Sequence, residues 1–212
     1  MGTEQHSKSN LCNFFIILCL VTGSYNASAA TIRATIHTSA GQIPIELFAD
    51  HAPITVTNFL NLSQRGFYDE LPFYREQPGI LVLVGNPSRQ KNGGPGYRIA
   101  DEIHPKLAHD RPGILSMDSF GPGGGGSQFV ITRKRTRWRD GRFTIFGRVT
   151  SPAGLQIVND LTKSDYITRI EIQDEYLKLF ALHTELLSKW NAILDKKLAK
   201  RQAFKEILRK LR

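Results

Sequence analysis

The sequence GILSMDSFGPGGGGSQFVITRKRTRWRDGRFTIFGRV occupies residues 113–149 and has the clearest strand pattern of the chain. Three short apolar segments, at residues 114–117, 128–132 and 143–149, are separated by a glycine run and by an Asp-Gly turn. Apolar segments joined by tight turns predict antiparallel strands. The glycine run has the spacing of a dinucleotide-binding fingerprint, but that motif must open a helix, and here a strand follows. The pattern therefore argues against a nucleotide cofactor.

Short strands also dominate the rest of the chain. Residues 31–38 and 42–48 alternate in polarity around a turn, so they predict a half-buried hairpin. Pro53 opens a helical segment that ends before Gly66, which is the usual asymmetry of helix ends. Further strands are predicted at residues 73–76, 80–85 and 168–172, and a second helix at residues 154–162. Strands and helices do not alternate, which excludes a parallel fold, and a closed antiparallel barrel is favoured because closure leaves no exposed edges.

Residues 1–29 have the composition of a secretory signal peptide. A polar start precedes an apolar run at residues 14–21, and the small-residue triplet at residues 27–29 fits a cleavage site. Both cysteines, Cys12 and Cys19, lie in this leader, so the mature protein is expected to contain none. An uncleaved anchor and a lipoprotein anchor at Cys19 remain open. We expect an exported protein, most simply in a bacterial periplasm, with a secretory lumen or the extracellular space as alternatives.

The formal net charge of +9 is concentrated in two places. Residues 133–142 hold six basic side chains against Asp140, and residues 174–212 hold ten basic and five acidic ones. Such local concentrations favour an acidic partner. A nucleic-acid partner is not expected, because the leader predicts export. The histidines show no spacing typical of metal ligands, so we predict neither a metal nor a cofactor.

Residues 174–212 predict a long amphipathic helix. Leucines and aromatic residues, among them Trp190 and Phe204, recur at mostly helical spacing among lysines and arginines, without proline or glycine. The apolar face could pack back on the barrel or on a second copy of the chain. Binding to a membrane surface is the other alternative, since a basic helix with aromatic residues suits that interface.

An ordered set of short motifs carries a family resemblance. It comprises FYR at residues 73–75, GGPGY at 93–97, GILSM at 113–117, GSQF at 126–129, Trp138, and DG at 140–141. In this order, the motifs resemble the cyclophilin family of peptidyl-prolyl cis-trans isomerases. The resemblance implies a mainly β fold, an eight-stranded antiparallel barrel with a helix over each end. It divides the chain into a signal peptide (1–29), a cyclophilin-like domain (30–173) and a basic helical extension (174–212).

The same resemblance implies a reaction and a site. Rotation about an X-Pro bond has a barrier of about 18–20 kcal/mol, because the planar amide loses its resonance. A catalyst must bind the twisted amide better than either planar form, and a guanidinium can donate a hydrogen bond to its nitrogen. The family's catalytic arginine is matched by Arg75. The implied substrates are proline-containing unfolded or exported polypeptides, and the substrate-binding positions are Ile80, Leu81, Leu83, Ser119, Gln128, Val130, Trp138, Arg139 and Phe143.

Several of these positions depart from the usual family residues. Leu83 replaces the glutamine that orients the arginine, Arg139 replaces a leucine, and Phe143 replaces a histidine. Residues 118–120 read Asp-Ser-Phe, where the family has a small residue on each side of an asparagine. Misplaced catalytic groups cost activity. Two hypotheses follow: an isomerase that assists folding with reduced turnover, and a non-catalytic chaperone or interaction module that binds proline-containing segments.

Overall fold

The computed structural model describes residues 31–88, 93–119, 121 and 123–210. Within these ranges the chain forms one eight-stranded sheet, four α-helices and one short 3-10 helix. The signal peptide predicted at residues 1–29 lies outside the described residues. A search of the described helices finds none with the length and apolar character needed to cross a bilayer.

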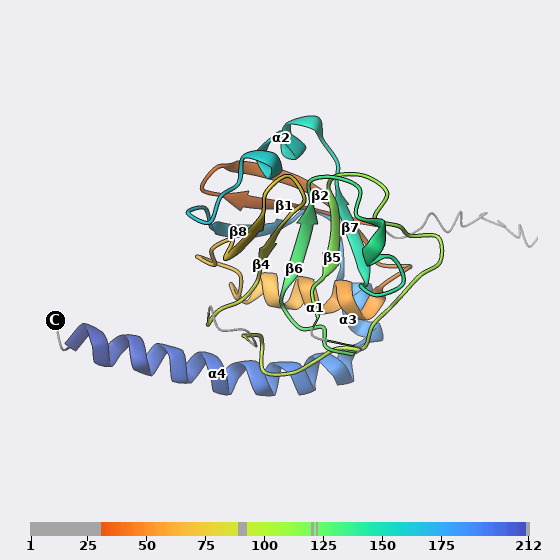
Figure 1. Cartoon of the computed structure of the whole chain (residues 1–212). Helices are drawn as coiled ribbons and strands as arrows, with labels where there is room; N and C mark the ends of the chain where they lie inside the picture. The colour runs from red at the N-terminus through yellow and green to blue at the C-terminus, as the bar shows by residue number, and fades with distance from the viewer. Residues whose placement is uncertain (1–30, 89–92, 120, 122, 211–212) are drawn as a thin grey trace, which may run out of the picture.

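The sheet is antiparallel throughout, in the order β3-β4-β6-β5-β7-β2-β1-β8 (Figure 1). Residues 113–149 supply β6, β5 and β7, which stand next to one another in the middle of this order. The predicted hairpin is formed by the first two strands, whose turn has Gly41 at a φ of +139°, where a side chain would be strained. The strand bounds are β1 (Thr31–Thr38), β2 (Gly41–Phe48), β3 (Arg75–Gln77), β4 (Leu81–Val84), β5 (Ile114–Met117), β6 (Phe129–Thr132), β7 (Ile145–Val149) and β8 (Ile167–Ile172).

The prediction of a closed barrel was wrong, because the sheet is an open half-barrel. Its two outer strands are β3 and β8, and the described strands form no ladder between them. The chain segments that precede these strands pair around Pro72 and Tyr166, where Phe73 donates to the Asp165 carbonyl and Ile167 donates to the Leu71 carbonyl. Among the described strands, β3 has only three residues and pairs with β4, so this pairing does not continue into a ladder between β3 and β8.

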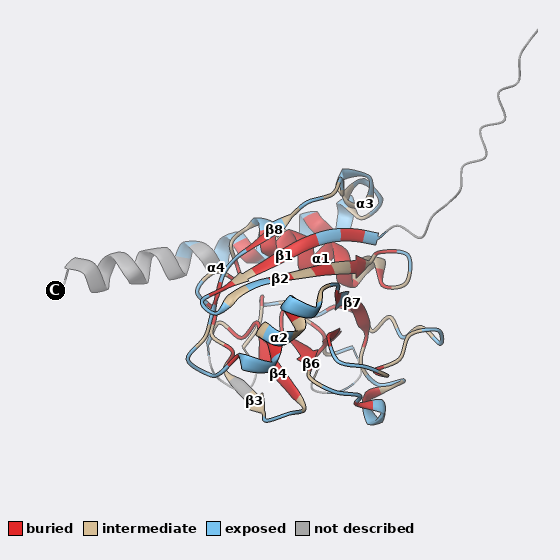
Figure 2. Cartoon of the chain, turned by 90° about the horizontal axis from the view of Figure 1, so that it is seen from above, coloured by how far each residue is buried: buried red, intermediate tan, exposed pale blue. Residues whose placement is uncertain are grey.

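The core lies on the inner face of the sheet and is built around aromatic rings. The Phe59 ring centroid lies 5.5 Å from that of Phe129 and 5.3 Å from that of Phe146. Phe59 comes from α1 (Pro53–Gln64), whereas the other two rings come from β6 and β7. Figure 2 shows buried residues along these elements. The helix and the middle of the sheet therefore share one core.

Two helices lie at opposite ends of the sheet (Figure 1). At the start of α1, the carboxylate of Glu102 accepts hydrogen bonds from the backbone N–H groups of Ile54 (2.9 Å) and Thr55 (2.7 Å). The second helix, α2 (Pro152–Asp160), begins two residues earlier than predicted. The reason is local: the Ser151 side chain accepts from the backbone N–H of Gly154 at 3.0 Å, which caps the helix before the predicted start.

The carboxyl-terminal segment forms two helices where one was predicted. These are α3 (Leu177–Leu182) and α4 (Thr184–Lys210), and the chain leaves the helical conformation at His183. The first half of α4 packs on the barrel, with Leu187, Trp190 and Leu194 buried in the main core cluster. Figure 1 shows α4 running beneath the sheet and continuing beyond it. Of the alternatives predicted for this helix, packing of its apolar face on the cyclophilin-like domain is therefore the one observed for residues 187–194.

Candidate active site

The predicted catalytic arginine lies on the edge strand β3. In the β3-β4-β6 ladder, Arg75 pairs with Leu83, and Leu83 pairs in turn with Val130. Only the backbone of Arg75 is described. The three positions thus form one row across three neighbouring strands. The row begins at the position matched to the family's catalytic arginine and continues through two predicted substrate-binding positions.

A second apolar cluster lies on the outer face of this ladder. It contains the buried residues Leu81, Leu83 and Val130, against which the half-buried Ile80 and Tyr74 pack. Side chains alternate between the two faces along β4, which explains this second cluster. Val82 and Val84 lie in the main core, and Leu81 and Leu83 lie on the other face. The structure thus brings together four of the nine predicted substrate-binding residues: Ile80, Leu81, Leu83 and Val130.

Gln128 is held in place at the start of β6. Its Oε1 accepts from the Tyr74 hydroxyl at 2.5 Å, and its Nε2 donates to the Gly93 carbonyl. A hollow of about 60 Å³ opens beside it, lined in part by Gly94, Asp118 and Ser127. Gln128 is only 6% exposed, and these two bonds fix the orientation of its side-chain amide. Sequence reasoning did not identify Tyr74 or Gly93 as its partners.

Arg139 is buried beside Phe143. The carbon of its guanidinium lies 3.7 Å from the Phe143 ring centroid and 5.4 Å from that of Trp138, a cation–π arrangement. Its Nη2 lies 3.3 Å from the Met117 carbonyl and 3.3 Å from Asp118 Oδ1. Arg139 is 3% exposed, and Trp138 is 56% exposed. Three predicted site residues thus form a second group, with Trp138 at the surface and Arg139 beneath it.

Asp118 is the ion-pair partner of Arg139, a role that sequence reasoning did not identify. Burial lowers the pKa of Arg139, and the Asp118 carboxylate opposes this effect by favouring the charged guanidinium. An arginine remains charged at neutral pH even with a lowered pKa. The signal was present in the sequence, because two departures from the family pattern, at positions 118 and 139, introduce opposite charges. The two substitutions therefore compensate each other.

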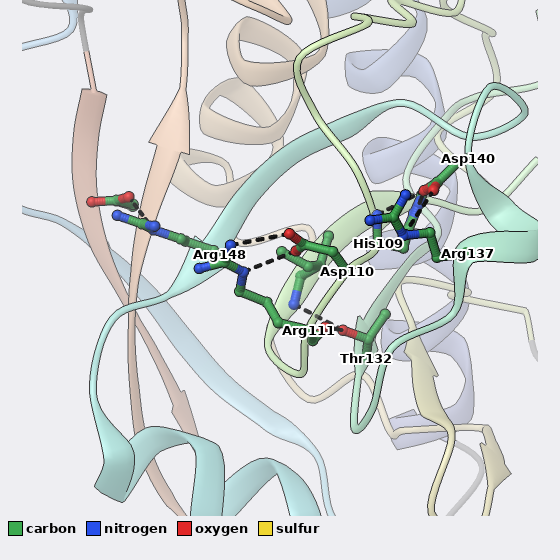
Figure 3. Close-up of polar contacts among 9 residues, drawn as sticks. His109, Asp110, Arg111, Thr132, Arg137, Asp140 and Arg148 are labelled. Atoms are coloured by element: carbon green, nitrogen blue, oxygen red, sulfur yellow. Dashed lines mark hydrogen bonds and ion pairs between the residues drawn. The ribbon is translucent and has the colours of Figure 1, made fainter.

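A hydrogen-bonded pair supports the short helix η1 (Arg137–Arg139) that carries Trp138 (Figure 3). Asp140 Oδ1 accepts from the backbone N–H of His109 at 2.7 Å and lies 2.8 Å from its Nδ1. Burial lowers the pKa of His109, although the bond to Asp140 opposes this shift. Burial also acts to raise the pKa of Asp140, but the hydrogen bonds from His109 outweigh it, and this pKa is lowered. The pair therefore joins neutral His109 to ionised Asp140.

Ser119 lies away from the apolar cluster. It lines a separate hollow of about 350 Å³ together with Asp101, Ile103, Arg142 and Phe143. Phe143 thus borders this hollow on one side and stacks on Arg139 on the other. Eight of the nine predicted substrate-binding residues thus fall into three groups: the apolar cluster, the Arg139 group and this hollow, the last two of which share Phe143. The ninth, Gln128, lies beside the first hollow. No set of three or more potential metal-binding side chains occurs in the described part of the chain.

The basic segment at residues 133–142 is only partly a surface feature. The Arg133 side chain is buried, pairs with Glu76 at 2.6 Å, and donates to the Val158 carbonyl at 3.0 Å. Arg139 is likewise committed to an internal pair. Lys134, Arg135, Arg137 and Arg142 are exposed. Part of the positive charge that favoured an acidic partner is therefore neutralised within the protein.

Comparison with known proteins agrees with this geometry. The family described as "Cyclophilin type peptidyl-prolyl cis-trans isomerase/CLD" matches residues 33–177. Peptidyl-prolyl cis-trans isomerase A of Mycobacterium tuberculosis is 40% identical over 154 residues, which cover 66% of this chain and 85% of the relative. Peptidyl-prolyl cis-trans isomerase-like 1 of Rhizopus delemar is 44% identical over 157 residues, covering 72% and 93% respectively.

Solved structures give the same result. A cyclophilin-type isomerase of Cryptosporidium parvum matches with a TM-score of 0.64 at 31% identity, covering 69% of this chain and 99% of that one. The same protein was also solved in the presence of the dipeptide Ala-Pro, and that structure matches with a TM-score of 0.62. The chain therefore belongs to the cyclophilin family of peptidyl-prolyl cis-trans isomerases.

Proposed function

We propose that this isomerase acts on proline-containing segments of exported polypeptides and that Arg75 is its catalytic donor. The row Arg75, Leu83, Val130 across three strands carries the proposal. It places position 75 in one row with two residues of the apolar cluster, and prolyl rotation requires a donor together with an apolar surface. The Cryptosporidium parvum relative was solved in the presence of Ala-Pro, a ligand of the chemistry proposed here.

The mechanism follows from the electronic change at the prolyl nitrogen. In the planar amide its lone pair is delocalised, and twisting restores a lone pair that accepts a hydrogen bond. The proline ring would pack on the cluster of Leu81, Leu83 and Val130, which excludes water from the rotating bond. The Arg75 guanidinium would then donate to the nitrogen only in the twisted state, and such differential binding lowers the barrier. Gln128 would hold the flanking peptide backbone.

The test is a comparison of Arg75→Ala with the wild-type mature chain. Isomerisation of an Ala-Pro peptide is followed by NMR exchange, which needs no coupled protease. Loss of a donor aimed at the transition state is expected to lower kcat/KM by about a hundredfold. Arg111→Ala is the matched control, because Arg111 is exposed and pairs with the neighbouring Asp110. Equal rates for Arg75→Ala and the wild type would remove the catalytic role of Arg75.

The second candidate is a non-catalytic chaperone that holds proline-containing segments. One observation favours it: Leu83, directly opposite Arg75, has no side-chain group that could orient a guanidinium. In that case the wild-type chain would bind the peptide, with saturable shifts of the Trp138 indole signal, and would not accelerate exchange. Acceleration by the wild type that Arg75→Ala abolishes would eliminate this candidate.

The cellular location and the further partners are also proposals. The predicted leader supports export to a periplasm, and cell fractionation with amino-terminal sequencing tests it: a mature chain beginning at Ala30 is expected. Membrane binding or self-association through residues 174–212 is supported by the exposed Leu177 and Leu182 on α3. Flotation with anionic vesicles and sedimentation equilibrium distinguish these two partners, and a lipid-free monomer would contradict both.

A further inference from the structure

The side chain of Gln128 is hydrogen-bonded to a glycine-rich loop. Residues 93–97, here called the 93–97 loop, read Gly-Gly-Pro-Gly-Tyr. The carbonyl of Gly93 accepts the hydrogen bond from Gln128 Nε2. At the other end of the loop, the Tyr97 hydroxyl donates to Asn58 Oδ1 at 2.7 Å, and Asn58 Nδ2 donates to the Gly126 carbonyl at 2.6 Å. One end of the loop is thus bonded directly to Gln128, and the other end is linked through Asn58 to Gly126, two residues before Gln128.

The loop cannot be rigid on account of its own sequence. Three of its five residues are glycines, and Gly96 has a φ of +104°. Glycine loses more conformational freedom on ordering than any other residue. The Gln128 side chain donates to the Gly93 carbonyl of this loop. This contact is therefore well placed only if another element holds the loop.

Helix α4 is that element. The Trp190 ring stacks on Tyr97 with centroids 5.2 Å apart and an interplanar angle of 8°. One turn further on, Ile193 lies so close to Gly96 that an added Cβ would be 3.0 Å from its Cγ2. Another turn along, the ammonium of Lys197 donates to the Gly94 carbonyl. Three successive turns of one helix therefore contact three residues of the loop.

The same helix is anchored to the body independently of the loop. Asn191 accepts a hydrogen bond from Nδ2 of Asn61, on α1, at 3.0 Å. Asp195 pairs with Arg65, the residue that follows α1. These anchors fix α4 on the barrel, and the contacts of Trp190, Ile193 and Lys197 transmit that fixed position to the loop. From this arrangement we infer that Lys197 is a positioning residue for the peptide-binding Gln128, acting through the loop carbonyls.

The inference has a kinetic signature that mere destabilisation lacks. It rests on the proposed role of Gln128 in holding the flanking peptide. A loosened Gln128 binds peptide less well, so Lys197→Met is expected to raise KM by about fivefold with kcat nearly unchanged, the effect of one charge-assisted hydrogen bond. A partly unfolded enzyme would instead show a lowered kcat and an unchanged KM. Lys197→Arg keeps a donor and is expected to return KM to within about twofold of the wild type.

Two further variants complete the kinetic test. Asp195→Asn removes the charge from one of several contacts that hold α4, while the bond between Asn191 and Asn61 and the buried Leu187, Trp190 and Leu194 remain. The helix therefore keeps its position, and the KM of this variant is expected to match the wild type. In a Gln128→Ala background, Lys197→Met should cause no further rise in KM, because the residue it acts through is gone. An unchanged KM in Lys197→Met, an equal rise in Asp195→Asn, or additive effects with Gln128→Ala would each overturn the inference.

A measurement without turnover separates this inference from the proposed function. The side-chain amide signal of Gln128 is followed by NMR in the full mature chain without peptide. Faster hydrogen exchange of this amide in Lys197→Met, but not in Asp195→Asn, is expected even if the wild type proves inactive. Identical exchange in both variants would overturn the positioning role while leaving the isomerase assignment intact.

Discussion

The two faces of β4 and β6 show how differently one ladder can be used. On the inner face, Val82, Val84 and Phe129 belong to the main apolar core, which also contains Phe59 of α1. On the outer face, Leu81, Leu83 and Val130 form a small cluster of their own. The inner face is packed from all sides by α1 and by the rest of the sheet, whereas the outer face borders the position proposed to bind peptide.

The comparison teaches where a fold tolerates change. A closely packed interior responds to the loss of even one methylene, so its residues are constrained by volume. The departures from the family pattern, such as Leu83 and Arg139, instead lie on or beside the outer face. There a new charge requires one partner, and Asp118 supplies it at 3.3 Å. On or beside the outer face, a charged residue can therefore be accommodated together with a partner of opposite charge, while the apolar residues of the inner face are retained.

The largest expected effect comes from breaking the inner face. Phe129→Ala removes a ring that contacts Phe59 and Phe146, and it should lower the free energy of unfolding by about 4 kcal/mol. The matched variant one residue on, Val130→Ala, should cost no more than about 2 kcal/mol, because fewer atoms are lost. Urea denaturation measures both. Equal losses would show that the two faces contribute alike.

The next effect tests the charged pair beside the outer face. Asp118→Ala leaves the buried Arg139 without its carboxylate, which should lower the free energy of unfolding by about 2 kcal/mol. The double variant Asp118→Ala with Arg139→Leu removes both charges and should recover most of that loss. Thermal and urea denaturation of the two single variants and the double variant give the coupling.

One result of these denaturation measurements would contradict the pairing of Asp118 with Arg139. If the two single losses simply add in the double variant, Asp118 and Arg139 do not act as a pair. If the double variant is also a faster isomerase than the wild type, the charged pair limits turnover in the wild type. Peptide exchange rates measured at equal concentrations of folded protein decide this point.

Much of the architecture was predictable because it depends on local patterns. The alternation of residues 31–48 and the turn residues of 113–149 predict strands that the structure contains. The apolar nature of the cluster at Leu81 and Val130 was likewise predictable from the motif match. The alternation and the turns are set by residues close together in the sequence, so the local pattern is sufficient for them. Leu81 and Val130 lie far apart in the sequence, and only the family match predicted them together.

The features that sequence reasoning missed depend on contacts between distant residues. Closure was predicted because it would remove edges, but the segments before β3 and β8 pair only around Pro72 and Tyr166, which lie 94 positions apart, and β3 and β8 themselves do not pair. The break at His183 follows no proline or glycine, and it redirects the chain so that α4 reaches the 93–97 loop. The pairing of Asp118 with Arg139 also spans 21 positions. No periodicity reports such contacts.

A smaller effect is expected from returning a polar group to the outer face. Leu83→Gln places an amide opposite Arg75, where the family usually has a glutamine that orients the arginine. Isomerase turnover should rise about threefold, because a supported donor is better placed. The free energy of unfolding should fall by about 1 kcal/mol, since an apolar contact is lost from the cluster. Leu83→Met is the control, and a rise in turnover there would contradict the orienting role.

The smallest effect concerns pH and the pair that supports η1. Burial lowers the pKa of His109 below its ordinary value of about 6.5, against the opposing bond from Asp140. The unfolded chain therefore takes up this proton first as the pH falls. The stability contributed by neutral His109 is complete above about pH 6.5 and is lost below it. The lowered pKa of Asp140 adds a second loss only below the ordinary aspartate value of about 3.9.

His109→Asn separates the two pH ranges, because an asparagine amide can still donate to Asp140 but does not titrate. Urea denaturation at a series of pH values should show that, as the pH falls below about 6.5, wild-type stability declines more steeply than that of the variant. Below about pH 4 the two should decline together, since both retain Asp140. Arg137 and Arg139, the cations nearest the pair, stay charged throughout. Identical slopes in the upper range would mean that His109 is not held neutral in the folded protein.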